Sequence, residues 1–172
     1  RADEIEQQCR PLSEQSVFSY RYQWSEADCK IFAPISWNDY RARCRALAQN
    51  SAYVVVTDIS DFYPRIYHHR LENALARLPN AGVLRSRIMK FLQVCSSTDS
   101  YGLPVGGPAS RLLAELALVD VDSYLTAKAV LFCRYADDFT MFATSREQAY
   151  RQLVFLADKL FNEGLSLQKK KT

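Results

Sequence analysis

Three aspartates are the residues of this chain whose type and spacing could do chemistry. Asp58 follows the apolar run 52–57, and the adjacent pair Asp137 and Asp138 separates two later apolar runs. Carboxylates gathered at one edge of a sheet repel each other, so compensating positive charge is needed to keep them ionised. Hard oxygen ligands without His or Cys nearby favour Mg²⁺ or Mn²⁺ over zinc. The acids therefore predict a two-metal site, in which one ion activates an attacking oxygen and the other stabilises the leaving oxygen.

Each aspartate taken singly also has an ordinary structural interpretation. An Asp-Asp pair is common at the tip of a hairpin, and Asp58 could simply cap the helix that follows it. The two interpretations differ in whether the three side chains meet. Taken jointly, and placed at the ends of strands, the acids favour the metal site.

The elements that must position the acids are strands. Residues 52–57 are β-branched and almost wholly apolar, the pattern of a strand covered on both faces in the middle of a sheet. The runs 130–135 and 139–143 flank the Asp-Asp pair and predict a hairpin. Helices are expected over 37–49, after Pro64, over 83–95, from Pro108 and after a capping pattern at 144–148, with a last strand over 165–168. This order predicts the split βαβ fold, an α+β class in which the first and third strands pair at the centre.

The first third of the chain is less regular. Residues 1–36 show no sustained period, although 17–22 alternate as a strand would. The helix expected over 37–49 carries Arg41 and Arg45 on a face separate from its apolar positions, which gives it a basic side.

Length and composition bound the class of protein. The 172 residues amount to one domain with an appendage at most, and 48% hydrophobic with 24% charged residues is typical of a globular chain with a core. No apolar run approaches the roughly 20 residues of a membrane span and no signal peptide opens the chain, so we expect a cytoplasmic protein without membrane association. The five cysteines lack metal-ligand spacing and are interpreted as buried thiols. A net charge of +3 is too small to demonstrate a polyanionic partner.

Four motifs resemble those of reverse transcriptases, in the same order and with the same spacing. They are Thr57-Asp58-Ile59-Ser60-Asp61-Phe62-Tyr63-Pro64, the Gly-rich segment from Gly102 to Ser110, the box Tyr135-Ala136-Asp137-Asp138, and the ending from Gly164 to Thr172. The stretch 61–69 and the Lys-Thr ending resemble the bacterial enzymes of retron, group II intron and antiviral abortive-infection types, of which we favour the antiviral type. The resemblance implies a right-hand polymerase palm over 52–172, with a ferredoxin-like antiparallel sheet and helices on one face. Residues 1–51 would be part of a fingers region, and the thumb would be absent from this piece of a longer polypeptide.

What the resemblance implies about chemistry is RNA-directed DNA synthesis. In that reaction a primer 3′-hydroxyl attacks the α-phosphate of a dNTP with the help of Mg²⁺ or Mn²⁺. Asp58, Asp137 and Asp138 would be the catalytic, metal-binding acids, and Ile59 would offer a backbone carbonyl to a metal ion. Lys171 matches a lysine that is a candidate general acid for the pyrophosphate leaving group.

The resemblance also implies a nucleotide site. Asp61 and Phe62 would lend backbone amides to the triphosphate. Tyr63 stands where the family has an aromatic gate that clashes with a ribose 2′-hydroxyl. Val105 and Gly106 would run beneath the incoming nucleotide, although Val105 replaces the Gln of retroviral enzymes.

Basic side chains of the first third are expected to meet phosphates. Arg21, on the expected strand 17–22, is the first choice for a fingers residue against the triphosphate. Arg41, Arg43 and Arg45 would track a template backbone, and Tyr135 would lie against the nucleic acid. The expected partners are an RNA template, a DNA primer, dNTPs, a thumb or C-terminal domain and a non-coding RNA. Two alternatives stay open: a non-catalytic module of the RNA-recognition type, which shares the strand order, and a palm enzyme that makes RNA or untemplated DNA.

Overall fold

The core of the molecule is a three-stranded antiparallel sheet. The computed structural model describes residues 1–96 and 100–168. Strands β3 (Tyr53–Asp58), β5 (Asp138–Ala143) and β4 (Leu131–Tyr135) follow the order β3-β5-β4. The register sets Tyr53 opposite Ala143 at one end and Asp58 opposite Asp138 at the other. The predicted hairpin and the predicted pairing of the first with the third strand are therefore both confirmed.

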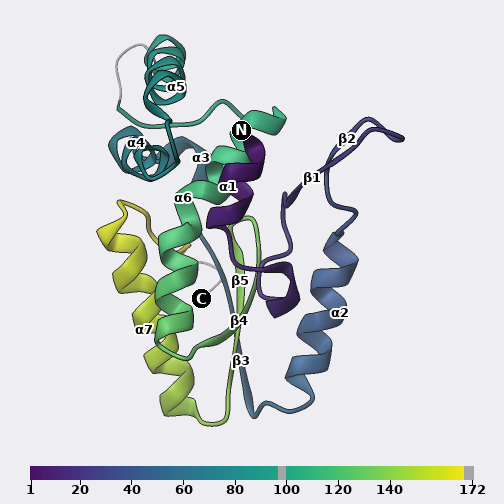
Figure 1. Ribbon diagram of the computed structural model, residues 1–172. Coiled ribbons are helices and arrows are strands. Elements are labelled where there is room, and N and C mark those ends of the chain that lie inside the picture. The colour runs from purple at the N-terminus through teal and green to yellow at the C-terminus, as the bar shows by residue number, and fades with distance from the viewer. Residues whose placement is uncertain (97–99, 169–172) are drawn as a thin grey trace.

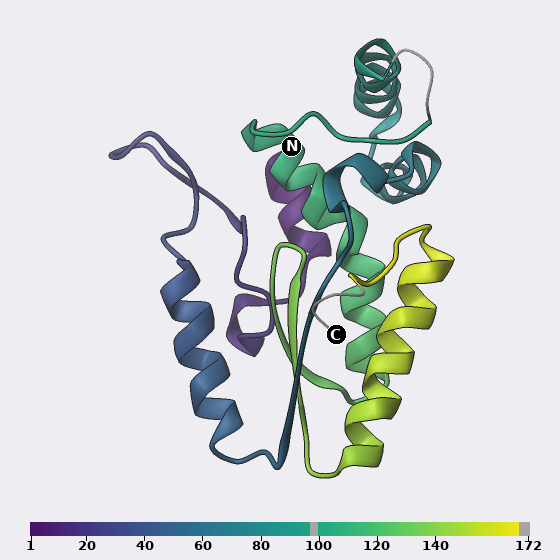
Figure 2. The same ribbon diagram turned by 180° about the vertical axis from the view of Figure 1, so that it is seen from behind.

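Helices pack on the two faces of this sheet (Figure 1). Helices α6 (Pro108–Ala127) and α7 (Arg146–Asn162) lie on one face, and α2 (Trp37–Ala48) lies on the other, as the view from behind also shows (Figure 2). Alternation along β5 divides the core accordingly, because successive side chains of a strand point to opposite faces. Phe139 and Met141 belong to the larger cluster with α6 and α7, whereas Phe142 packs with Tyr40 of α2.

Local signals explain where these helices begin. Ser36 forms a capping box with Asp39 at the start of α2, and Ser145 accepts the Gln148 backbone N–H at the start of α7. Pro108 occupies the first turn of α6, where its missing N–H costs nothing. The helices predicted over 37–49, over 83–95, from Pro108 and after the 144–148 capping pattern are confirmed, the second of them as α5 (Gly82–Cys95).

The single helix predicted after Pro64 is two helices. Helix α3 (Phe62–Arg65) ends before Ile66, whose ψ of 115° is extended, and α4 (His68–Ala76) begins two residues later. The break lets Ile66 accept a backbone hydrogen bond from Gly102 at 2.9 Å. Both views show α4 and α5 beyond the end of the sheet to which the tip of the β4–β5 hairpin points.

The strand predicted over 17–22 is wrong. The N-terminal region holds α1 (Ala2–Gln8), a 3₁₀ turn (Leu12–Glu14) and the small hairpin of β1 (Tyr22–Ser25) and β2 (Lys30–Phe32). Val17 makes only an isolated bridge to Arg134, and Tyr20 has a φ of 47°. A left-handed residue interrupts an extended strand, so β1 starts only after it.

Two predictions about the sheet's edge also need correction. Strand β3 is not in the middle: among the described residues it lies at an edge, and Val54 and Val56 are exposed. The last strand predicted over 165–168 is reduced to a bridge between Leu167 and Ile59. Backbone bonds from Ser60 to Ser166 and from Gln168 to Asp58, both 2.8 Å, hold this segment beside the end of β3. None of the described helices is long and apolar enough to cross a membrane.

Candidate active site

The sheet brings the predicted acids to one end of its two paired strands. Asp58 is the last residue of β3 and lies directly opposite Asp138, the first residue of β5. Ile59, the next residue, donates its backbone N–H to the Asp137 carbonyl oxygen at 3.1 Å. That bond makes Asp58 and Asp138 a non-hydrogen-bonded pair, the kind whose side chains approach most closely across a ladder. Segments almost 80 residues apart in the sequence thus meet at this edge.

The hairpin loop holds Asp137 between the two strands. Tyr135 pairs with Asp138, so Ala136 and Asp137 form a two-residue loop. Ala136 has a φ of 53°. A positive φ at the first loop residue belongs to the primed turns, whose twist matches the strands that they connect. Because Ala carries a Cβ, this conformation is strained and must be held by its surroundings.

The donor set fits a hard divalent cation by type and by register. Asp58, Asp138 and the loop residue Asp137 offer carboxylate oxygens, the ligands preferred by Mg²⁺ and Mn²⁺. Within residues 1–96 and 100–168, however, no three His, Cys, Asp or Glu side chains are arranged so that they could enclose a metal ion. The structure therefore places the acids side by side without forming a closed metal cage. Ile59 is buried, and the role predicted for its carbonyl stays a prediction.

The segment after Asp58 carries the predicted nucleotide residues. Asp61 is exposed, has a φ of 48° and lies 3.5 Å from Arg65, whereas the Phe62 side chain is buried in the core. Tyr63 is half-buried, and its carbonyl oxygen accepts the Leu103 backbone N–H at 2.9 Å.

The Gly-rich loop lies beside this segment because of two backbone bonds. Besides the Leu103 bond, the N–H of Gly102 reaches the Ile66 carbonyl oxygen, and the φ of Gly102 is 98°. A side chain at Gly102 would be strained there and would contact the Pro64 carbonyl at 3.5 Å. Val105, 77% exposed, and the exposed Gly106 follow Leu103 in the same loop and are open to solvent. Lys171 lies outside the described residues.

Arg21 does not occupy the position predicted for it. Arg21 precedes β1 rather than lying on a strand, is only 2% exposed and forms an ion pair with Glu6. Its Nη1 also lies 3.5 Å from the Val17 carbonyl oxygen. A buried and paired guanidinium is not available to a triphosphate, so the structure contradicts this prediction.

The sequence reasoning missed a cation that lies much closer to the site. Arg111, in the first turn of α6, places its guanidinium carbon 4.8 Å from the centre of the Tyr20 ring. Burial raises the pKa of Tyr63 to about 12, and Tyr20 and Glu115 add smaller upward contributions. The positive charge of Arg111 acts in the opposite direction and lowers the pKa of Tyr63. The signal was available, because Arg111 is a basic residue placed directly after the Gly-rich loop.

A groove runs from Asp138 along the α2 face of the sheet. Its cavity of about 460 Å³ lies between α2 and the exposed face of β3 and β5. Its lining includes Trp37, Tyr40, Arg41, Cys44, Arg45, Ala48, Val54, Val56, Asp138 and Thr140. Arg41 and Arg45 are one helical turn apart and share this groove, whereas Arg43 lines a different hollow with Glu14 and Leu131. Two of the three predicted arginines therefore share a groove with Asp138.

Tyr135 is held in an aromatic cluster beside this groove. Its ring centre lies 5.2 Å from that of Trp37, 6.0 Å from that of Tyr40 and 6.2 Å from that of Tyr20.

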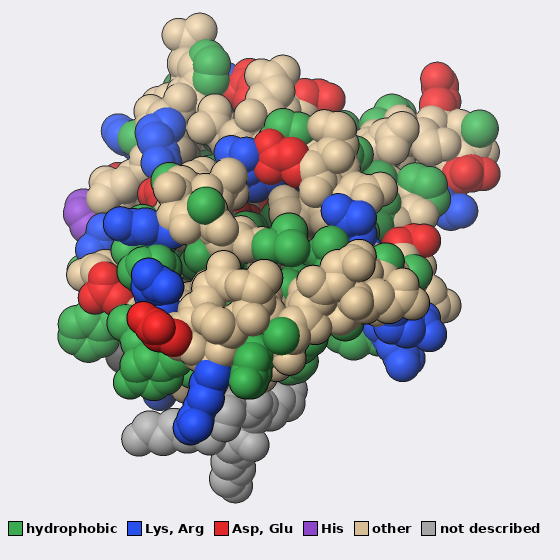
Figure 3. All heavy atoms as spheres, turned by 90° about the horizontal axis from the view of Figure 1, so that it is seen from below, with side chains coloured by type: hydrophobic (Ala, Val, Ile, Leu, Met, Phe, Trp, Pro, Cys, Tyr) green, Lys and Arg blue, Asp and Glu red, His purple; other side chains and the backbone are tan. Residues whose placement is uncertain are grey.

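The end of the molecule seen in Figure 3 shows Lys and Arg side chains interspersed with Asp and Glu. On the described part of that face, positive charge is not gathered into one surface. The basic groove beside Asp138 is thus the better match to a polyanion.

Comparisons with known proteins agree with this geometry. A family profile described as reverse transcriptase (RNA-dependent DNA polymerase) matches residues 4–172. The chain is also similar to the retron Ec86 reverse transcriptase of Escherichia coli, with 27% identity over 124 residues. That alignment covers 70% of this chain and 37% of the relative. The chain therefore spans little more than a third of the length of the curated relative that it matches.

Proposed function

We propose, because this chain belongs to the reverse transcriptase (RNA-dependent DNA polymerase) family, that it carries the catalytic centre of an RNA-directed DNA polymerase. The observation that carries the proposal is the register that sets Asp58 opposite Asp138 while the Ile59 N–H holds the loop of Asp137. A structural turn would not need three acids where two strands meet, because like charges there destabilise it. Residues 52–172 would form the palm and 1–51 part of the fingers.

The three acids would hold two Mg²⁺ or Mn²⁺ ions in this proposal. Such ions, when bound, activate the primer hydroxyl and neutralise charge on the leaving pyrophosphate. The part of the chain itself is positioning, because phosphoryl transfer depends mainly on geometry and charge. The backbone bond between Ile59 and Asp137 fixes the spacing of the two strands that carry the acids.

The residues around the acids would select and place the nucleotide. Backbone amides of Asp61 and Phe62 would meet the triphosphate, and Tyr63 would exclude a ribose 2′-hydroxyl. The support for this arrangement is the pair of backbone bonds that sets the Gly-rich loop, with Val105 and Gly106, beside Tyr63. Arg111 takes the place that Arg21 cannot fill, because its charge faces the tyrosines beside the acids.

The groove along α2 would take the template and primer. Arg41 and Arg45 line it together with Asp138, so a phosphate backbone lying there would reach the acids. Tyr135 borders the groove through its contact with Trp37. Lys171 remains the proposed general acid for pyrophosphate. On the family resemblance we further propose a non-coding RNA partner and a role in bacterial antiviral defence, which RNA extracted with the purified protein and a phage challenge would test.

Primer extension with the complete protein tests the activity. We expect labelled dNTPs to be added to a DNA primer on an RNA template, and Asp137→Asn to abolish the addition. Asp120→Asn is the matched control, since Asp120 is an exposed acid on α6. Binding of RNA without synthesis in the wild type would instead support a recognition module. Incorporation of rNTPs, or synthesis that continues without template, would support the other palm activities.

A further inference from the structure

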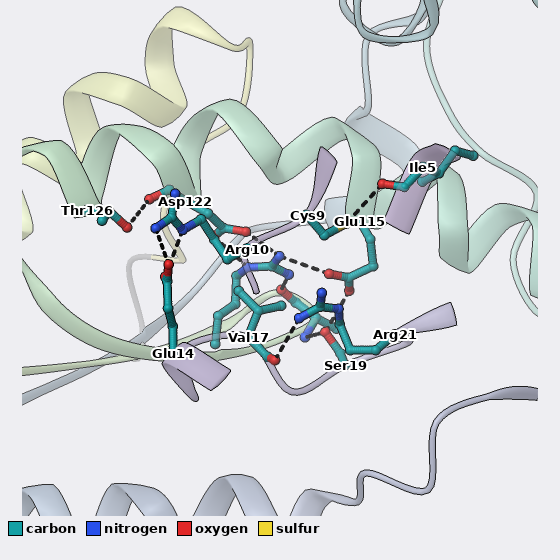
Figure 4. A network of polar contacts seen from close by, with 12 residues as sticks. Ile5, Cys9, Arg10, Glu14, Val17, Ser19, Arg21, Glu115, Asp122 and Thr126 are labelled. Carbon is teal, nitrogen blue, oxygen red and sulfur yellow. Dashed lines mark hydrogen bonds and ion pairs between the residues drawn. The ribbon is translucent and has the colours of Figure 1, made fainter. Parts of the chain in front are cut away.

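Behind the hairpin loop lies a buried network of charged side chains. Arg134, on β4, forms a two-pronged ion pair with Asp122 of α6, with Nε–Oδ1 and Nη2–Oδ2 distances of 2.8 and 2.6 Å. Its Nη2 also donates to Glu115 at 2.9 Å, and Glu115 in turn accepts the Ser19 hydroxyl at 2.6 Å. Figure 4 shows Glu115 reaching from its helix toward Ser19, with Asp122 farther along the same helix beside Thr126. Arg134, Glu115 and Asp122 are each at most 2% exposed.

This network holds both backbone polar groups of Ala136. Nη1 of Arg134 donates to the Ala136 carbonyl oxygen at 2.9 Å, and the Ala136 N–H donates to the Ser19 hydroxyl at 2.7 Å. Ala136 is the left-handed residue of the loop that carries Asp137. The strained conformation therefore persists because two side chains of the network saturate its hydrogen bonds.

The network and the catalytic acids lie on opposite faces of the same short segment. Side chains alternate along β4, so Arg134 points to the α6 face while Tyr135 points to the α2 face. Arg134 is also bound through its backbone, since its N–H donates to the Ser16 carbonyl and its carbonyl accepts from Phe18. The loop thus has no freedom to shift without breaking buried, charge-assisted bonds.

We propose that Arg134, Glu115, Asp122 and Ser19 are positioning residues that fix the hairpin loop so that Asp137 and Asp138 face Asp58. The proposal rests on the proposed polymerase function and adds to it a buried support for the acids. All four residues are buried behind the loop. Their effect passes through the Ala136 backbone, and misplacing a reacting group by about 1 Å costs about 100-fold in rate.

The competing interpretation is that the network only stabilises the fold. Buried ion pairs are weak evidence for stability, because apolar side chains of similar size often do as well. The two interpretations differ in what happens when one loop contact is removed and the ion pairs are kept.

The test is Ser19→Ala in the complete protein, which removes the hydroxyl that bridges Ala136 and Glu115 and leaves Arg134 with both acids. We expect kcat for dNTP addition to fall about 10- to 100-fold with KM for dNTP within twofold, measured well below the unfolding temperature. The matched control is Gln152→Met, which removes a buried bond to the Phe142 carbonyl at the far end of β5. It should lower Tm and leave kcat unchanged.

Two further measurements keep the result decisive. Hydrogen exchange of the peptide over 134–138 should become at least tenfold faster in Ser19→Ala and stay unchanged in Gln152→Met. Arg134→Lys, which keeps a positive charge but loses the fork that reaches Ala136, should lower kcat about 100-fold and give the same faster exchange.

The outcomes separate this proposal from the proposed function. If the wild type does not extend primers, the polymerase proposal fails, and exchange at 134–138 still tests the support of the loop. Unchanged exchange in Ser19→Ala overturns the positioning role. The positioning role is also overturned if kcat falls in both Ser19→Ala and Gln152→Met, in each case in proportion to the loss of Tm.

Discussion

Removing the buried guanidinium is the sharpest test of how the core is held together. In Arg134→Met, Glu115 and Asp122 stay buried but lose their ion pairs with Arg134. Among the described residues, no other cation forms an ion pair with either acid. Breaking a buried ion pair by removing one partner costs about 3–5 kcal/mol. Against a typical unfolding free energy of about 5–15 kcal/mol, that loss leaves little stability. With a urea m-value of about 2 kcal/mol/M, the midpoint of unfolding should fall by about 2 M.

The loss in Arg134→Met should depend on pH in a defined direction. Burial raises the pKa of Glu115, against the pull of Arg134 and Ser19. A carboxyl whose pKa is higher in the folded state favours folding below its unfolded pKa of about 4.3, and that contribution is lost as pH rises. Without Arg134 the pKa of Glu115 rises further, so the difference in unfolding free energy from wild type should be largest near pH 7 and shrink toward pH 5.

A surface ion pair provides the control for this experiment. Arg77, at the end of α4, binds Asp120 of α6 through two bonds of 2.6 and 3.1 Å, but the two side chains are 46% and 41% exposed. Arg77→Met should cost no more than about 1 kcal/mol and show no comparable pH dependence. Urea unfolding at pH 5 and pH 7, followed by circular dichroism, measures both variants. If Arg134→Met is no more destabilised than Arg77→Met at pH 7, the reasoning about the buried network is refuted.

Substitutions at three further places test the proposed nucleotide site and the core. In single-nucleotide incorporation, Tyr63→Ala should reduce the preference for dNTP over rNTP at least tenfold, while Tyr63→Phe should keep it. An equal preference in the wild type and both variants would exclude Tyr63 as the gate against the ribose 2′-hydroxyl. Arg111→Ala should raise KM for dNTP about tenfold, since a charge-assisted contact to phosphate is lost; an unchanged KM would remove Arg111 from the site. Leu156→Ala, in a fully buried position of α7, should cost about 2–5 kcal/mol of unfolding free energy, whereas Val154→Ala at an exposed position of the same helix should cost less than about 0.5 kcal/mol.

The sequence predicted those parts of the site that depend on short-range patterns. Two apolar runs around Asp137 and Asp138 made a hairpin the economical interpretation, and the ladder has that hairpin. The pairing of Asp58 with Asp138 followed from the order of the elements, because few topologies suit that order. Helix boundaries were predictable where a side chain caps the first turn, as Ser36 and Ser145 do.

The N-terminal region was not predictable, because contacts distant in sequence decide its conformation. Residues 17–22 alternate like a strand, yet Val17 makes only an isolated bridge to Arg134 of β4, and the Tyr20 ring packs against Arg111. Arg21 was assigned to the nucleotide because it lies within the strand expected over 17–22. Its actual partner is Glu6, on a helix that the alternating pattern gave no reason to expect.

The buried network left a signal that pattern analysis passed over. Glu115 and Asp122 are seven residues apart, so they occupy the same face of α6, and most of the other buried residues of that helix are apolar. Acids are almost never fully buried unless paired, so two of them on a buried stripe indicate a buried cation. Arg134, a basic residue within an apolar strand, is the matching signal on the other side. Together, the two acids on α6 and the arginine on β4 indicate a buried ion pair between these elements, although neither feature does so alone.

The position of this network beside the loop has a physical reason that an apolar core does not supply. The N–H and C=O groups of Ala136 point into the protein, where no strand partner can receive them. Leucine or methionine at position 134 would fill the space and leave the carbonyl unsatisfied, which costs about 1–3 kcal/mol and frees the loop to adopt other conformations. A guanidinium has enough donors to bind two acids and still reach this carbonyl. The same bonds that satisfy a strained backbone therefore connect the geometry of Asp137 to α6, so a substitution at Asp122 should shift the acids that we propose to be catalytic.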